Sequence, residues 1–465
     1  MNAEKMSIVD ESRRPSMTII MLAWPVFIEQ ILVSLVSYVD TAMVGSMGAN
    51  ATAAVSISNS PNMLVNGTIM AIGVGFTAMI SRSIGAENLD RAKDLIRQAL
   101  LVVVALGLPL MCVLLLLAEK IPLWMGAAPD VLPDATVYNQ IIAASLIFRT
   151  MSMIITSIMR GYGDTKTPMC VNIGVNLVNV IGNFLLIYPT RELSVFGMEF
   201  TMPGAGWGVA GAAVATSGSA TIGALVMLGV IFLQKGPMRL SIKGQYLPDW
   251  ALLKTVFRIS LPAAFERIAM SSAGIISTST IATLGTVAVA ANSLYLTAES
   301  MCFMPGFAFA TAATTLVGQS LGAKRPDLAE KYVKRTCQIG GLVMLVMSVF
   351  LYVFAEPILR MFTPDLAVIA LGAVCLQYDA IIQVPQMLAT VLSGALRGAG
   401  DTKWPFIIIA ASVWCVRIMG TVIGIRVLKF GLTAACLAMC ADQCVRCVLF
   451  FFRYRTGRWK EAIRD

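Results

Sequence analysis

The sequence contains no histidine, and only 13% of its 465 residues are charged. A soluble domain ordinarily carries about a quarter charged residues. A chain with so few charges cannot cover itself with polar surface, so its surroundings must be lipid. Because histidine is absent, a histidine proton relay is excluded. Any proton chemistry in this chain must therefore use carboxylates.

Sequence motifs for nucleotide binding and catalysis are also missing. There is no P-loop, nucleophile elbow or zinc motif. The segment Gly206-Trp-Gly-Val-Ala-Gly211 matches G-x-G-x-x-G, but we expect no strand before it and find no acidic residue at the required distance after it. We interpret it as the closely packed start of a membrane helix. The sequence thus predicts a protein that is not an enzyme and has no cofactor.

The sequence is rich in long apolar runs. Hydrophobic residues make up 57% of the chain, and the mean hydropathy is +0.78. Since one membrane span needs roughly 20 apolar residues, the chain accommodates about twelve spans. The ten cysteines fall almost entirely within these runs, so we expect no disulfide framework. Cys436, Cys440, Cys444 and Cys447 share one helix face, which indicates helix packing more than a metal site.

The positive charges alternate between loops. A net charge of +9 could indicate a nucleic-acid partner, but most lysines and arginines fall in the two tails and in every second loop. Cytoplasmic loops carry such an excess. The pattern predicts a multi-pass protein of the plasma membrane with both termini in the cytoplasm and no nucleic-acid partner.

Two halves of the chain repeat at one offset. Arg160-Gly-Tyr-Gly-Asp-Thr-Lys-Thr-Pro168 recurs as Arg397-Gly-Ala-Gly-Asp-Thr-Lys-Trp-Pro405, and Arg160 and Arg397 are 237 residues apart. The offset also relates Pro25, Glu29, Gly48 and Gly85 to Pro262, Glu266, Gly285 and Gly322. We predict two parallel six-helix bundles, an N-lobe over 1–233 and a C-lobe over 255–465, joined by a cytoplasmic linker over 234–254. Parallel repeats place a substrate site between the halves near the bilayer midplane, with access alternating as one half rocks against the other.

Several carboxylates lie inside the predicted spans. Each costs roughly 2.5–3.5 kcal/mol at the bilayer centre, so it usually lines a cavity or has a partner. Asp40 is the sharpest candidate, because no cationic residue lies within four positions of it. Such a carboxylate can hold a proton, a sodium ion or a cationic compound in turn, which is the physical basis of antiport. Glu266 and Asp379 form a second candidate pair in the C-terminal half.

Other polar residues in the spans have local interpretations. Asn179 and Asn183, one turn apart on a polar stripe, could supply oxygen ligands to a hard cation. Asp442 and Arg446 are spaced for an ion pair within one helix. Arg149 and Arg417 either neutralise a neighbouring carboxylate or extend toward the membrane surface.

These residues and motifs resemble the multidrug and toxic compound extrusion (MATE) family of antiporters. The resemblance covers essentially the whole chain and rests on four segments: Val39-Asp-Thr-Ala-Met-Val-Gly45, the doubled Arg-Gly-x-Gly-Asp-Thr-Lys-x-Pro, Leu316-Val-Gly-Gln-Ser-Leu-Gly-Ala323 and Gly208–Thr216. It implies an all-α fold of twelve membrane helices in two pseudo-twofold six-helix bundles. It also implies export of organic cations against H⁺ or Na⁺.

The resemblance also implies roles for single residues. Asp40 is similar to the cation-site aspartate of the family's N-lobe, with Asn179 and Thr216 as its polar partners. Glu266 and Asp379 are similar to acidic residues proposed to couple cations in the C-lobe of the NorM-like branch. Asn183 stands where DinF-like members have a second aspartate, while Trp414 and Arg417 look DinF-like. The sequence therefore does not separate the two branches.

The prediction is a secondary active transporter that exports small organic, cationic compounds as a monomer in the lipid bilayer. The coupling ion is H⁺ or Na⁺, with sodium at Asp40 or at Glu266 and Asp379. Further candidate cavity residues are Glu29, Glu299, Tyr378 and Gln383. The alternative is a flippase of a lipid-linked precursor on the same architecture, for which a strongly cationic cavity is expected.

Overall fold

The computed structural model describes residues 14–195, 198–233, 239–241 and 246–462. Lys5, Arg13 and Arg464 and part of the predicted linker lie outside the described residues. The first half of the chain forms α1 (Pro15–Gly45), α2 (Ala49–Gly85), α3 (Leu89–Leu116), α4 (Lys120–Trp124), α5 (Leu132–Ala144), α6 (Leu146–Tyr162), α7 (Lys166–Leu186) and α8 (Gly208–Leu233).

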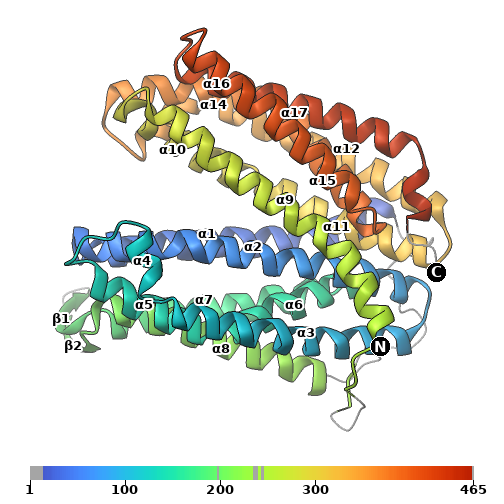
Figure 1. The fold of residues 1–465 in the computed structure, drawn as a ribbon, viewed down its shortest axis with the longest axis horizontal. Helices are drawn as coiled ribbons and strands as arrows, with labels where there is room; N and C mark the ends of the chain where they lie inside the picture. The colour runs from blue at the N-terminus through green and yellow to red at the C-terminus, as the bar shows by residue number, and fades with distance from the viewer. Residues whose placement is uncertain (1–13, 196–197, 234–238, 242–245, 463–465) are drawn as a thin grey trace.

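The second half is also helical. It forms α9 (Trp250–Ala282), α10 (Thr286–Cys302), α11 (Met304–Gly322), α12 (Pro326–Val353), α13 (Ala355–Arg360), α14 (Leu366–Gly398), α15 (Lys403–Ser412), a π-helix η1 (Val413–Ile418), α16 (Met419–Arg426), α17 (Leu432–Arg455) and a short 3₁₀ helix (Arg458–Glu461). Figure 1 shows the two halves as separate bundles whose termini lie at the same end.

The helices are long enough to account for the predicted membrane spans. Among the described residues, nine are long and apolar enough to cross a membrane, or up to eleven if two bent pairs each count as one span. These pairs are α5 with α6, bent by 49°, and α10 with α11, bent by 46°. We count the 33-residue α9 as the twelfth, although it carries four charged side chains, at Lys254, Arg258, Glu266 and Arg267. The predicted all-α membrane fold is confirmed.

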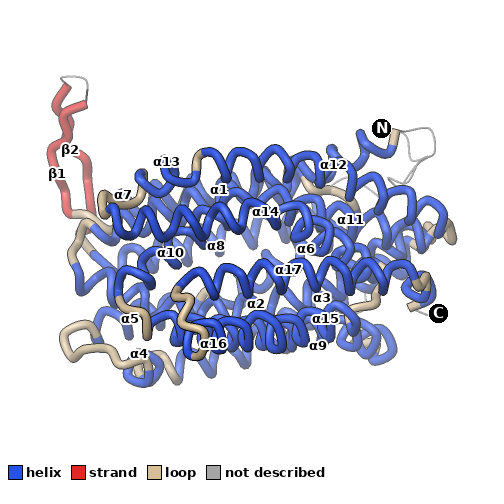
Figure 2. The backbone as a smooth tube through the Cα atoms, turned by 90° about the horizontal axis from the view of Figure 1, so that it is seen from above, coloured by secondary structure: helices blue, strands red, loops and turns tan. Residues whose placement is uncertain are grey.

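A β-hairpin interrupts the helices between α7 and α8. Strands β1 (Pro189–Val195) and β2 (Met198–Ala205) pair antiparallel and project from the end of the bundles away from the termini (Figure 2). The expectation that no strand precedes Gly206 is therefore wrong. In the described part of the chain no parallel strand follows α8, so the hairpin is not the β-α-β unit that a dinucleotide site requires.

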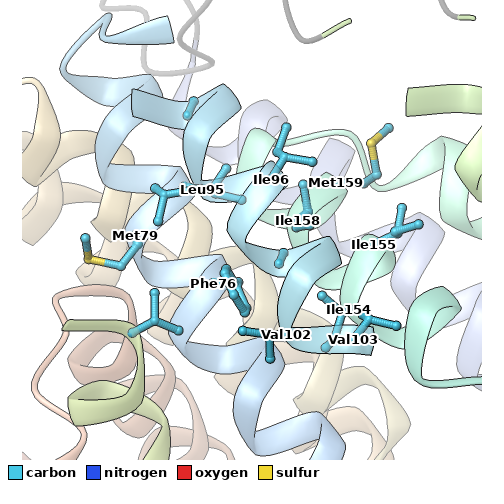
Figure 3. Close-up of a cluster of buried hydrophobic side chains, with 14 of the residues drawn as sticks. Phe76, Met79, Leu95, Ile96, Val102, Val103, Ile154, Ile155, Ile158 and Met159 are labelled. Carbon is cyan, nitrogen blue, oxygen red and sulfur yellow. The ribbon is translucent and has the colours of Figure 1, made fainter. Parts of the chain in front are cut away.

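Each bundle has an apolar interior. In the N-terminal bundle, Phe76, Leu95 and Ile155 from α2, α3 and α6 are buried in one cluster (Figure 3). In the C-terminal bundle, Ala395, Val413 and Phe450 belong to a comparable cluster. Because lipid tails are themselves apolar, such packing orients the helices through close contact rather than through removal of water.

Repeated glycines have repeated structural roles. Gly48 (φ 112°) and Gly285 (φ 99°) precede α2 and α10 in a backbone conformation that side chains rarely adopt. At the contact between the halves, a Cβ at Gly85 would overlap the carbonyl of Gln319, and one at Gly322 would overlap that of Arg82. Because glycine has no side chain, α2 and α11 can cross closely at the end of the bundles that carries the termini (Figure 1).

The cysteine prediction requires a correction. Cys375 of α14 and Cys436 of α17 form a disulfide with a Cα–Cα separation of 5.6 Å. We expected no disulfide framework because the cysteines lie in apolar runs, and the sequence does not reveal that these two helices bring a pair of them into contact. In the part of the chain that the structure describes, no group of three or more Cys, Asp or Glu side chains could hold a metal ion.

Candidate functional site

Two buried glutamates are held by arginines of the repeated motif. Glu29 of α1 is 2.8 Å from Arg160 and also accepts a hydrogen bond from Asn172 at 2.6 Å. Glu266 of α9 is 2.6 Å from Arg397. Glutamates and arginines alike are related by the 237-residue offset, so each half contains the same pair. A carboxylate neutralised in this way holds the first and fourth spans of its half together, α1 with α6 in the first half and α9 with α14 in the second.

The N-terminal half also contains a carboxylate without a cationic partner. Asp40, half-buried on α1, accepts a hydrogen bond from Asn183 of α7 at 2.5 Å. With its amide turned so that the nitrogen faces Asp40, Asn179 donates to the same oxygen at 2.9 Å and accepts from Thr216 of α8 at 3.3 Å. The structure thus brings together all four residues predicted for this site. Among the described residues, no Lys or Arg pairs with Asp40.

Small residues position these partners. A Cβ at Gly182 would contact Ala215, and one at Gly223 would overlap the side chain of Val175. Helices α7 and α8 therefore approach closely along much of their length. That approach places Asn179 opposite Thr216, while the one-turn spacing of Asn179 and Asn183 aims both amides at α1.

Asp379 has a different neighbour from the one predicted. It is buried on α14, where Gln383 donates to its Oδ2 at 2.6 Å. Glu299 of α10 is also buried and accepts from Gln386 at 2.9 Å. Asp379 and Glu299 lie close enough to interact electrostatically, whereas Glu266 is engaged by Arg397. The sequence singled out Asp379, Glu299 and Gln383 but not Gln386, whose spacing of three from Gln383 was the available signal.

The oxygens around these two carboxylates are incompletely satisfied. Oδ1 of Asp379 and Oε1 of both Gln383 and Gln386 are buried without a hydrogen-bond donor among the described residues. Leaving a buried acceptor unpaired costs roughly 1–3 kcal/mol. Such acceptors suit a proton or a hard cation, for which oxygen is the preferred ligand. Tyr378, also a candidate, is half-buried and contacts Cys440 through its backbone carbonyl at 3.5 Å.

A third charged cluster surrounds Asp442 of α17. Arg446, four residues later, binds both of its oxygens at 2.8 and 2.6 Å, which confirms the predicted ion pair. Ser412 donates to the same carboxylate at 2.5 Å, and Arg417 approaches it at 3.0 Å. Arg149, by contrast, donates to the amide oxygen of Asn66 at 3.0 Å. Of the two arginines, Arg417 therefore has a carboxylate neighbour and Arg149 an amide.

A cavity lies beside Arg417. Its volume is about 110 Å³, and α9, α10, η1 and α17 form its walls. Polar atoms come from Arg417, Asn292 and Tyr295, while Met270 and Met439 supply apolar surface. Sequence reasoning did not predict this cavity, because its lining residues come from four separate helices.

The family comparison matches the chain twice. The MatE family model covers residues 25–185 and again residues 262–423. Among curated proteins, a probable multidrug resistance protein NorM of Thermotoga maritima is 28% identical, with 95% of this chain and 93% of that protein covered. The uncharacterized transporter YisQ of Bacillus subtilis is 26% identical over 94% of each chain.

Solved structures agree with this fold. A crystal structure described as MATE in complex with MaD3S superimposes with a TM-score of 0.89 at 20% identity, covering 99% of this chain and 100% of that one. A structure described as the outward-facing conformation of a multidrug resistance MATE family transporter gives a TM-score of 0.88 over the same shares, also at 20% identity. At this identity the likeness establishes the architecture.

Proposed function

This chain belongs to the MATE family, and we propose that it is a secondary active transporter that exports small organic cations in exchange for H⁺ or Na⁺. The observation that carries the proposal is Asp40, a half-buried carboxylate that accepts hydrogen bonds from the amides of Asn183 and Asn179 and has no Lys or Arg partner among the described residues. Such a site keeps its negative charge available. It can hold the coupling ion or the cargo, but not both.

The coupling site of the C-terminal half is, in this proposal, the pair of Asp379 and Glu299. Both are buried, both have an amide partner, and unpaired acceptor oxygens surround them. Glu266 has the opposite character, because Arg397 neutralises it. We therefore assign Glu266 to the framework of the bundle and retain Asp379 as the coupling residue of this half.

Alternating access follows from the two-bundle architecture. The halves meet through close crossings of α2 with α11 and of α2 with α9, near the end that carries the termini. Rocking about this contact would expose the space between the halves to either side in turn. We infer that this end faces the cytoplasm, because the loops rich in Lys and Arg are expected on the cytoplasmic side. The flippase alternative is less well supported, because a strongly cationic cavity between the halves is not what Asp40 and its amide partners provide.

The test is export of a cationic dye from proteoliposomes under a proton or sodium gradient, each imposed separately. Asp40→Asn removes the charge while keeping the shape, and we expect dye export to fall at least tenfold. Asp379→Asn with Glu299→Gln tests the second pair, and a similar loss is expected. Glu356→Gln, an exposed carboxylate near the surface, is the matched control and should retain full export. Undiminished export by the Asp40 variant would remove this site from the mechanism.

A further inference from the structure

The cavity beside Arg417 occupies the place in the C-terminal half that the Asp40 site occupies in the N-terminal half. The Asp40 site is built by α1, α7 and α8, which are the first, fifth and sixth spans of their half. The cavity is lined from α9, η1 and α17, which are the corresponding spans, together with α10. At the 237-residue offset Asp40 matches Ser277, which lines the cavity. The two sites are therefore structural counterparts.

Their charges are opposite. Where the first half has a carboxylate, the second has the neutral Ser277, and the cavity receives its charge from Arg417, whose counterpart is the apolar Val180. The surrounding helix is irregular as well, because η1 is a π-helix while α7 is regular. Single π-turns inside α-helices are frequent at functional sites. Here the wider turn accompanies the one arginine that lines the cavity.

Asp442 does not fully neutralise the positive charge of Arg417. Asp442 already receives two charge-assisted hydrogen bonds from Arg446 and one from the Ser412 hydroxyl. Arg417 approaches it with Nε at 3.0 Å without donating a hydrogen bond, and among the described residues its terminal nitrogens donate none either. The side chain remains 24% exposed. Guanidinium groups left in this state recognise carboxylate and phosphate through paired N–H donors.

The two other nearby carboxylates, Asp379 and Glu299, form no hydrogen bond with Arg417 among the described residues. Asp379 and Glu299 interact electrostatically with Arg417, but neither lines the cavity, and each is hydrogen-bonded to a glutamine. Further donors do line it, namely the Asn292 amide and the Ser277 and Thr278 hydroxyls. Met270 and Met439 add adaptable apolar surface. One cation, several neutral donors and two thioethers suit an anionic group attached to an apolar body.

We propose that this cavity binds a single anionic group, a carboxylate or a phosphate, on a small amphipathic molecule, with Arg417 as its principal ligand. A volume of about 110 Å³ is large enough for such a group, since one water occupies about 30 Å³ in the liquid. This site is independent of cation export: it is defined by binding, and it stands whether or not Asp40 drives transport.

Binding of 4-nitrobenzoate to the purified full-length protein, measured by calorimetry in detergent, tests the proposal. We expect saturable binding that weakens at least tenfold in Arg417→Gln and by a smaller factor in Arg417→Lys, which keeps the charge but not the paired donors. Arg426→Gln removes the same charge from the exposed end of the same span and is the matched control. Quenching of Trp414 fluorescence, lost in Trp414→Phe, locates the ligand beside η1.

Ligand variants separate charge from shape. The neutral 4-nitrobenzamide should bind at least tenfold more weakly, and 4-nitrobenzylammonium should not bind. The proposal would be overturned if 4-nitrobenzoate and 4-nitrobenzamide bound equally well, or if 4-nitrobenzylammonium bound more tightly than 4-nitrobenzoate. Unchanged binding of 4-nitrobenzoate in Arg417→Gln would overturn it as well. Because Arg417→Gln could disturb Asp442, Asn292→Leu provides a second test that leaves the ion pairs intact and should weaken binding severalfold.

The source of the anionic group is decided in nanodiscs. Competition between 4-nitrobenzoate and phosphatidylglycerol, absent with phosphatidylcholine, would assign the site to a lipid phosphate. Binding unaffected by phosphatidylglycerol would assign it to a soluble acid. Both results support an anion site, whereas absence of 4-nitrobenzoate binding in detergent and in both lipids contradicts it.

Discussion

The two halves of this protein share a framework and differ in the polar groups placed within it. Both contain the buried pair of a first-span glutamate with an arginine of the Arg-Gly-x-Gly-Asp motif. Both also have a threonine, Thr77 and Thr314, bonded to a backbone carbonyl 80 residues further along at 2.9 Å. What is duplicated holds a bundle together. What is found in one half only, such as Asp40 or Arg417, distinguishes the chemistry of the two halves.

We expect the largest change in stability when one partner of a duplicated ion pair is replaced. Removing one partner of a buried pair leaves an uncompensated charge, at a cost of about 3–5 kcal/mol. We expect Glu29→Gln and Glu266→Gln to lower thermal stability in detergent by similar, large amounts. The measurement is unfolding followed by intrinsic fluorescence.

The control for that experiment is the double replacement. Glu266→Gln with Arg397→Gln removes both charges and should recover much of the stability lost in the single variant. If Glu266→Gln instead folds like the parent and loses only transport, the glutamate belongs to the coupling machinery, and the comparison between the halves fails at this position.

The glycine crossings should give an intermediate effect, again equal in the two halves. A methyl group at Gly85 or Gly322 would overlap backbone of the opposite half, and overpacking of this kind costs roughly 1–3 kcal/mol. We expect Gly85→Ala and Gly322→Ala to shift the protein away from the described conformation. Distances between spin labels on the two halves would report the shift.

Gly341→Ala is the matched control for the crossings, because nothing lies near the added methyl group. It should leave the distance distribution unchanged. A Gly85 variant that behaves like the Gly341 variant would show that the close crossing of α2 and α11 does not hold this conformation together.

The smallest effect is expected from the amide partners of the carboxylates. A hydrogen bond to a buried group contributes net about 0.5–1.5 kcal/mol, so its loss corresponds to a factor of roughly 2–10 in affinity. We expect Asn179→Ala and Gln383→Ala to raise the half-saturating concentration of the coupling ion within that range. Initial rates of dye export at varied ion concentration measure it.

The same two variants show which half binds the coupling ion. A change in Asn179→Ala alone would confine coupling to the N-terminal half, and a change in Gln383→Ala alone would confine it to the C-terminal half. Ser348→Ala, which removes a hydroxyl bonded to the backbone of α14 without touching either carboxylate, should leave the ion dependence unchanged.

The fold was predictable because membrane spans and a duplication can both be recognised directly in the amino-acid sequence. Apolar length predicts a span, and a repeat that keeps one offset predicts two matched bundles. The N-terminal site was predictable for a similar reason: Asn179 and Asn183 lie one turn apart, and Asp40 lacks a cation nearby in sequence. Those relations are local, and helical geometry converts them directly into a shared face.

Contacts between distant helices were not predictable in this way. The partner of Glu266, Arg397, lies 131 residues away in the sequence. The repeat contained the missing signal, since glutamate and arginine recur together at the same offset. The neighbour of Asp379, the Cys375–Cys436 disulfide and the hairpin before α8 had no comparable repeat to indicate them.

That this protein lies in a membrane as two similar bundles follows from the amino-acid sequence, because hydropathy and the repeat are properties of the chain alone. Which buried charges are neutralised and which remain available could be seen only in the three-dimensional arrangement of the helices. That outcome depends on which helices lie within a few ångströms of one another, and small residues such as Gly182 and Ala215 set those approaches.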